Sequence, residues 1–120
     1  MAKKFRFEKK FIDFGDICGK TYKVEHNQVI FDKKDEIGKQ MEAYQKNIDK
    51  ITDSKKGLEE LDAFLKESVD TFLGAGEYDT IFKDREFDIY ERMDLATYVL
   101  SIVGMADRKR MMKVSEYAAK

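Results

Sequence analysis

Residues 72–82 read FLGAGEYDTIF, with Gly74 and Gly76 on either side of a single alanine. A dinucleotide-binding fingerprint would need a third glycine where Asp79 stands, and a strand rather than a helical pattern before the first glycine. The Gly-Lys-Ser/Thr run of a Walker sequence is also missing. Glu77 and Asp79 would repel phosphate, although acidic residues suit the first turn of a helix. The stretch therefore predicts a corner between two helices, with Gly74 left-handed at the C′ position and Gly76 turning the chain.

Helical spacing of apolar residues continues on both sides of this corner. We expect one amphipathic helix after residue 32, capped by an aspartate at position 32 or 35. A second is expected after Ser54, where Gly57 disfavours simple continuation of the first. A capping box of Asp88 and Glu91 predicts the start of the most apolar, and therefore central, helix. The stripes comprise Ile37, Met41, Tyr44, Ile48 and Ile51, then Leu58, Leu61, Leu65, Val69 and Phe72, then Tyr78, Ile81 and Phe82.

The N-terminal part alternates between apolar and charged residues instead. Residues 4–13 read KFRFEKKFID, which predicts a half-buried strand, and the glycines and aspartates of FGDICGK predict a turn. Alternation resumes over residues 20–25, so we expect a β-hairpin. Residues 29–31 form either a third short strand or the apolar lead-in to the first helix.

Length and composition agree with a small folded unit. The chain has 120 residues, of which 42% are apolar and 39% charged, enough for one modest core but hardly two. We predict a single domain with an α+β fold, mainly α-helical with about four helices and an N-terminal β-hairpin. Its parts would be a hairpin region (1–31), a helical region (32–105) and a basic tail (106–120). That tail would continue the last helix, fray, or become ordered only on a partner.

The sequence predicts a cytoplasmic protein without membrane contact. Cys18 is the only cysteine, which excludes an internal disulfide and fits a reducing compartment. Residues 1–11 lack the apolar run of a signal peptide. No stretch approaches the roughly 18 to 20 apolar residues that a membrane span needs.

Candidate chemical groups do not form a recognisable catalytic or metal-binding pattern. His26 is the only histidine, and with Cys18 it supplies fewer ligands than a structural zinc site usually has. The acidic residues of the second long helix are expected to form a solvated face. We therefore predict no enzyme activity, no cofactor and no metal. The acidic residues in question are Glu59, Glu60, Asp62, Glu67 and Asp70.

Charge is distributed unevenly, although the formal net charge is only −1. Residues 1–10 and residues 108–120 each carry five basic and one acidic side chain, whereas residues 59–94 carry twelve acidic and four basic ones. Basic ends and an acidic middle allow head-to-tail self-association or docking of a basic partner. The segment RKRMMK (108–113) also allows nucleic-acid binding, but it lacks the interleaved aromatic and glycine residues of common modules.

Three segments together resemble the small tail assembly chaperones of long-tailed phages and prophages of Gram-positive bacteria. They are FIDFGD followed by KTYKVE, the central EAY at residues 42–44, and ESVDTFLGAGEYDTIFKDR, spread over roughly residues 11–105. Lys83 departs from a glycine of the family pattern, and ICGK makes the hairpin turn longer than the tight version. The matching residues of the helix joint are Phe72, Gly74, Gly76, Ile81, Phe82 and Arg85.

The resemblance implies a protein that binds the tape measure protein, keeps it soluble and helps recruit tail tube subunits in the host cytoplasm. Such a protein needs exposed apolar surface, and six methionines, nine phenylalanines and six tyrosines exceed what one small core requires. For each aromatic candidate, core packing is the alternative to partner contact. A structural tail or neck subunit, and a nucleic-acid-associated regulatory protein, are the alternative functions. The expected partner-binding residues are Phe64, Phe72, Tyr78, Phe82, Arg108, Lys109, Arg110, Met111 and Met112.

Overall fold

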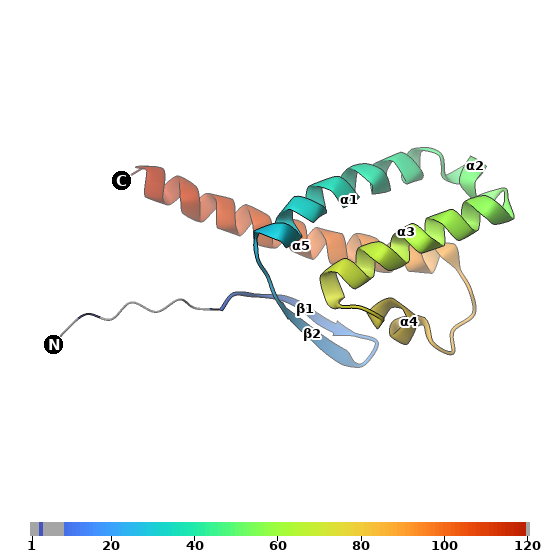
Figure 1. Cartoon of the computed structure of the whole chain (residues 1–120), viewed down its shortest axis with the longest axis horizontal. Coiled ribbons are helices and arrows are strands. Elements are labelled where there is room, and N and C mark those ends of the chain that lie inside the picture. The colour runs from blue at the N-terminus through green and yellow to red at the C-terminus, as the bar shows by residue number, and fades with distance from the viewer. Residues whose placement is uncertain (1–2, 4–8, 120) are drawn as a thin grey trace.

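The fold is mainly helical, with a two-stranded antiparallel hairpin at its N-terminal side (Figure 1). The computed structural model describes residue 3 and residues 9–119, with side chains as far as residue 114. This arrangement confirms the predicted α+β class. The elements are β1 (Phe11–Ile17), β2 (Lys20–Glu25), α1 (Gln28–Lys46), α2 (Ile48–Thr52), α3 (Lys55–Leu73), α4 (Glu77–Phe82) and α5 (Ile89–Ala119).

The long helix α5 is the central element. Helices α1 and α3 run side by side in opposite directions and both lie against α5, while β1 packs on α5 and β2 on α3 (Figure 1). Val99 and Val103 of α5 are fully buried among side chains from the other elements. The core comprises Ile12, Phe14, Ile17, Tyr22, Phe31, Met41, Leu61, Leu65, Val69, Phe72, Leu73, Tyr78, Phe82, Ile89, Met93, Ala96, Val99 and Val103.

The hairpin lies later in the chain than the alternation predicted. The FGDICGK segment is mostly strand, because Ile12, Phe14 and Ile17 all face the core. A bulge between Asp13 and Gly15 inserts the extra residue that brings Ile17 into phase. The turn itself is only Cys18 and Gly19, both at positive φ, as in a two-residue hairpin loop. Of the predicted strand at 4–13, residues 11–13 belong to β1, residues 9 and 10 precede it, and residues 4–8 lie outside the described residues.

Helix α1 begins earlier than residue 32. Its N-cap is Asn27, whose side chain accepts a hydrogen bond from the Val29 amide at 3.0 Å. Residues 29–31 therefore belong to the helix, which resolves the alternative left open by the sequence. Phe31 is buried, so its packing against the core outweighs the weak strand preference of this short run.

The break before α3 depends on Ser54 and Gly57. As predicted, Ser54 caps α3, and its Oγ accepts a hydrogen bond from the Gly57 amide at 3.0 Å. A Cβ atom at Gly57 would lie 2.1 Å from the Ile51 carbonyl oxygen. Glycine here therefore allows α2 and α3 to approach closely.

The GAG corner joins α3 to α4 as the sequence predicted, and Gly76 turns the chain into α4, but Gly74 is not in the expected left-handed helical conformation. Gly74 has φ +124° and ψ 153°, outside the left-handed helical region, whereas Gly76 has φ +82° and ψ −4°, inside it. Both values favour glycine. The side chain of Asp88 accepts hydrogen bonds from the Tyr90 and Glu91 amides at the start of α5.

The basic tail continues as part of α5 to residue 119. The sequence left three possibilities for residues 106–120: continuation of the last helix, fraying, or ordering on a partner. The described part of this segment, residues 106–119, continues the helix. Among the described residues, none of the helices combines the length and apolarity needed to cross a bilayer.

Candidate partner-binding surface

Helix α5 is fastened to α1 by a cluster of charged side chains around Asp107. The buried Asp107 carboxylate accepts hydrogen bonds from Lys34 Nζ at 2.7 Å and from Arg110 Nη2 at 2.8 Å. The Lys34 bond, followed by the Arg110 bond, lowers the pKa of Asp107. Arg110 also lies over the Phe31 ring at 4.3 Å and donates a hydrogen bond to Gln28. We call Asp107, Lys34 and Arg110 the charged clamp.

Strand β1 is held against the other side of α5. The Tyr98 hydroxyl donates a hydrogen bond to the Phe14 carbonyl oxygen at 2.7 Å, next to the β1 bulge. Phe14 itself is buried in the core. The clamp and this bond therefore fix the position of α5 relative to both α1 and the hairpin.

Beyond the clamp, α5 extends past the hairpin and α1 (Figure 1). Met111, Met112 and Val114 are 62%, 67% and 61% exposed. Arg108 and Lys113, on the same part of the helix, are exposed too. We call residues 108–114 the projecting end. It presents flexible apolar side chains beside cations, a combination common on surfaces that bind varied protein segments.

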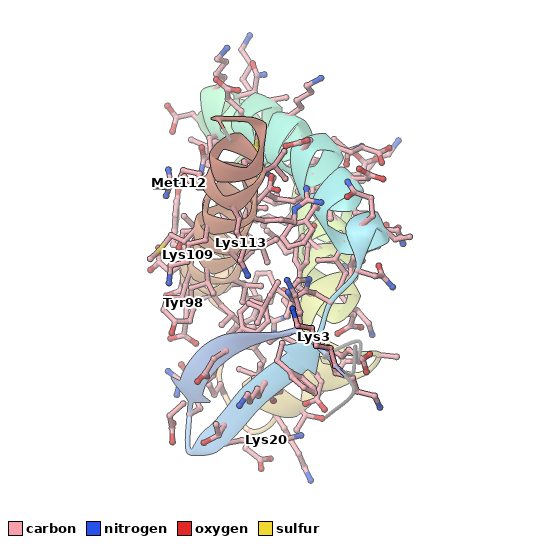
Figure 2. The ribbon with its side chains drawn as sticks, turned by 90° about the vertical axis from the view of Figure 1, so that its left-hand side faces the viewer. Lys3, Lys20, Tyr98, Lys109, Met112 and Lys113 are labelled. Carbon is pink, nitrogen blue, oxygen red and sulfur yellow. The ribbon has the colours of Figure 1, made fainter. Side chains whose placement is uncertain are left out.

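A groove of about 790 Å³ lies between β1 and the second half of α5. Its lining is apolar toward the middle of α5 and mainly basic toward the projecting end, and we call it the basic groove. Figure 2 shows Tyr98, Lys109 and Met112 on the same side of α5, with the hairpin below them. The lining residues are Phe11, Ile12, Ile102, Met105 and Ala106 on the apolar part, and Lys10, His26, Lys109, Arg110, Lys113 and the acidic Asp13 on the rim.

The pKa of His26 reflects the positive charge of this rim. Its ring is half-buried and meets the Phe31 ring edge-on, with centroids 5.0 Å apart. Burial lowers the pKa of His26, and the positive charges of Lys10 and Arg110 lower it further. The rim therefore disfavours an additional positive charge, and an acidic ligand is the complementary one.

At the opposite end of the molecule, Arg92 contacts side chains from several elements. Its guanidinium donates to Asp62 Oδ1 at 2.9 Å and lies over the rings of Phe82, Phe87 and Tyr78 at 4.7, 4.9 and 5.2 Å. The Tyr78 hydroxyl also donates to Asp62, and burial followed by this bond raises the pKa of Tyr78. These contacts stabilise the corner between α3, α4 and α5.

Two acidic residues of α3 therefore depart from the predicted solvated face. Asp62 pairs with Arg92, as described, and Asp70 Oδ1 accepts a hydrogen bond from the Tyr78 amide at 2.9 Å. Both carboxylates face the α4 side of α3, so they join neighbouring elements. Glu59, Glu60 and Glu67 are exposed, as predicted.

The structure separates the nine predicted partner-binding residues into three groups. Phe72, Tyr78 and Phe82 are only 2%, 1% and 7% exposed. They are core residues, and this corrects the expectation of direct partner contact. Phe64 is partly buried and packs against Tyr44, with ring centroids 4.9 Å apart.

The basic and methionine residues of the prediction lie together on α5. Arg108, Lys109, Met111 and Met112 are exposed, whereas Arg110 is engaged in the charged clamp. Sequence reasoning missed Met105 and the β1 side of the groove, Lys10 and Phe11. Met105 could have been found, since it precedes Met112 by seven residues and therefore shares its helix face.

The two residues considered for nucleophilic or metal-binding chemistry, Cys18 and His26, lie far apart. Cys18 is in the hairpin turn and His26 follows the other end of β2, about 20 Å away along a six-residue strand. Within the described part of the chain, no cluster of three His, Cys, Asp or Glu side chains could hold a metal ion.

Comparison with known proteins supplies no relative: no protein-family model, curated protein or solved structure matches the chain. Functional inference therefore rests on the residues themselves. The strongest features are the exposed apolar and basic side chains along the second half of α5.

Proposed function

We propose that this protein is a non-enzymatic assembly chaperone that binds the tape measure protein and tail tube subunits during phage tail assembly in the bacterial cytoplasm. The identity of the partners comes from the resemblance of residues 11–105 to tail assembly chaperones. A protein-binding role also has independent support from the surface of α5.

The single observation that supports binding is the projecting end. Met111, Met112 and Val114 are all more than half exposed on a helix that extends beyond the packed body. Exposed apolar side chains grouped in this way mark interaction sites on soluble proteins. Methionine adapts its shape to different apolar surfaces, which suits a chaperone that covers a long partner.

Binding to a purified tape measure fragment tests the proposal. We expect the double variant Met111→Asp/Met112→Asp to bind at least about tenfold more weakly than the wild type, because about 1.4 kcal/mol of apolar contact would be lost. Titration calorimetry measures the affinity, and light scattering shows whether the protein keeps the fragment soluble.

Val29→Asp is the matched control, since Val29 is 55% exposed but lies at the start of α1. It should bind like the wild type. A folded wild-type protein that neither binds tape measure fragments nor keeps them soluble would contradict the proposed function.

A structural tail or neck subunit is a second possibility from the same resemblance. It differs from a chaperone in one measurable respect, because a structural subunit remains in the mature particle. Mass spectrometry of purified virions would detect it there, whereas the proposed chaperone should be missing.

The basic projecting end favours one candidate from another class, a nucleic-acid-associated protein. Such binding should shift nucleic acid in a gel at low salt and weaken steeply as salt increases. No shift at low salt would exclude it.

A further inference from the structure

We propose that the unpaired edge of β1 binds an extended segment of another protein as a third strand, with the carboxylates of that segment beside the cations of the basic groove. This inference does not depend on the tape measure protein. It rests on the backbone of β1 and on the lining of the groove between β1 and α5.

The edge of β1 that faces away from β2 has free backbone groups. The His26 amide donates to the Lys10 carbonyl oxygen at 3.0 Å, and Ile12 is two residues further along the same ladder. Because successive residues of a strand direct their backbone groups to opposite edges, those of Phe11 and Asp13 point away from β2. Outside the β1–β2 ladder, no hydrogen bond among the described residues involves these amide and carbonyl groups.

Further along β1, helix α5 itself covers the strand. The Tyr98 hydroxyl donates to the Phe14 carbonyl oxygen at 2.7 Å. Toward the start of β1, the basic groove of about 790 Å³ lies between the strand and α5, and Phe11, Ile12 and Asp13 line it. The free edge therefore opens into a space of the size that ligand sites have.

The lining of the groove indicates which side chains the added strand carries. Ile102 and Met105 belong to the apolar part, and Met105 is 52% exposed. Lys109 and Lys113 follow at intervals of about one helical turn, and Figure 2 shows both on α5 above the hairpin. With Lys10, they form no ion pair within the described residues. The matching segment has apolar side chains at one end and carboxylates at the other.

The groove does not supply these carboxylates itself. Asp13 is the one acidic side chain among its lining residues, and its Oδ1 accepts a hydrogen bond from the Gly15 amide at 2.8 Å. Residues 1–8, the nearest segment in sequence, carry three basic side chains against one acidic one. The complementary charge therefore comes from another molecule.

A peptide fits this surface better than a nucleic acid does, although both carry negative charge. An extended peptide presents amide and carbonyl groups at the spacing of a strand edge, so it can pair with Phe11 and Asp13. Its alternate side chains can also reach the apolar part of the groove. Main-chain pairing supplies affinity in this mode of recognition, and the groove supplies specificity.

Two end-blocked, fluorescent heptapeptides test the proposal: Glu-Thr-Glu-Thr-Val-Thr-Val and its reverse, since a strand can add in either direction. Each presents two glutamates and two valines on one face when extended. Fluorescence anisotropy measures their binding to the full chain. We expect at least one peptide to bind with 1:1 stoichiometry.

Reversing the charge of the rim should weaken this binding. We expect Lys109→Glu/Lys113→Glu to lower the affinity at least about tenfold, because like charges would then face each other. Lys55→Glu/Lys56→Glu is the matched control, since it changes the net charge equally at exposed positions at the start of α3. It should bind like the wild type, and circular dichroism checks the folding of both variants.

N-methylation of the peptide tests the backbone pairing and leaves the protein unchanged. Methylating every second amide removes hydrogen-bond donors on one edge of the extended peptide, and the two possible sets affect opposite edges. One set should abolish binding and the other should preserve it. This difference is specific to strand addition, because both sets leave the charge of the peptide unaltered.

Three results would overturn the proposal. Neither peptide binds the wild type, as would also happen if a second copy of the chain occupied the groove. The two N-methylated sets bind equally, which indicates attraction by charge alone. A single-stranded oligonucleotide displaces the peptide and binds more tightly, which assigns the groove to nucleic acid. Since the peptides are unrelated to the tape measure protein, each outcome is independent of the proposed function.

Discussion

At the scale of single residues, Gly57 shows how one missing side chain permits the close approach of α2 and α3. Alanine normally stabilises a helix interior by about 1 kcal/mol relative to glycine. At Gly57 we expect the opposite sign, because the new Cβ would lie 2.1 Å from the backbone oxygen of Ile51. We predict that Gly57→Ala lowers the free energy of unfolding by about 1–3 kcal/mol.

Urea unfolding measures this change, and Gly38→Ala is the matched control. Gly38 is inside α1, and a Cβ there would meet nothing within 4 Å. We expect that variant to be more stable than the wild type by up to about 1 kcal/mol. Equal stabilisation by both substitutions would show that the contact at Gly57 is not restrictive.

His26 should make stability depend on pH near neutrality. Burial and the charges of Lys10 and Arg110 lower its pKa in the folded protein below the ordinary value of 6.5. As pH falls through about 6.5, the unfolded chain binds a proton that the folded chain resists, so the free energy of unfolding decreases. We predict that His26→Gln removes this part of the slope.

Urea unfolding of both proteins between about pH 5.5 and 7.5 checks the prediction, because carboxylates titrate mainly below this window. The difference between wild type and variant isolates His26. Parallel pH profiles for the two proteins would contradict the assigned environment of the imidazole.

At the scale of elements, the charged clamp positions the second half of α5. The Lys34 and Asp107 side chains are 19% and 10% exposed, so Asp107→Asn would leave the largely desolvated Lys34 ammonium group paired only with the exposed Asp35 carboxylate. We predict a loss of about 2 kcal/mol in the free energy of unfolding, with faster hydrogen exchange in the part of α5 beyond residue 106.

Arg85→Gln provides the comparison, since the Arg85 and Glu91 side chains are 52% and 36% exposed. An exposed pair contributes less than about 1 kcal/mol. Urea unfolding should therefore rank Asp107→Asn as the more damaging change. The reverse order would mean that the clamp contributes little to the attachment of α5.

At the scale of the whole molecule, the fold consists of a packed body and the helix α5, which extends beyond that body. The principal extents are 66 × 31 × 17 Å, and the 31 residues of α5 alone span about 46 Å. Among the side chains described, as far as residue 114, Val103 is the last core residue and Ala106 is the last partly buried apolar one packed on the core. Function and stability are therefore separated along α5.

Removing residues 111–120 should keep the body folded. We expect the free energy of unfolding to change by no more than about 0.5 kcal/mol, because the deleted described side chains contribute nothing to the core. Urea unfolding and circular dichroism measure this, and binding of the tape measure fragment should be lost at the same time. A loss of cooperative unfolding would show that the projecting end supports the body.

Local patterns in the sequence were sufficient for the elements that depend on short-range rules. The apolar spacing of α3, the Ser54 cap and the GAG corner all followed from neighbouring residues. The β1 bulge was missed because one extra residue at Asp13 to Gly15 reverses the alternation on which strand assignment depends. The start of α1 was missed because Asn27 precedes residues that also suit a strand.

The sequence by itself determined a mainly helical fold with an N-terminal hairpin, a glycine corner and an apolar last helix, since these features depend on spacing along the chain. Only the tertiary structure decided which side chains are accessible. Phe72, Tyr78 and Phe82 became core, Asp107 became a buried clamp, and Lys10 and Phe11 of the hairpin came to face Met105 of α5. Burial and pairing are properties of contacts between residues far apart in sequence, and periodicity within one segment cannot express them.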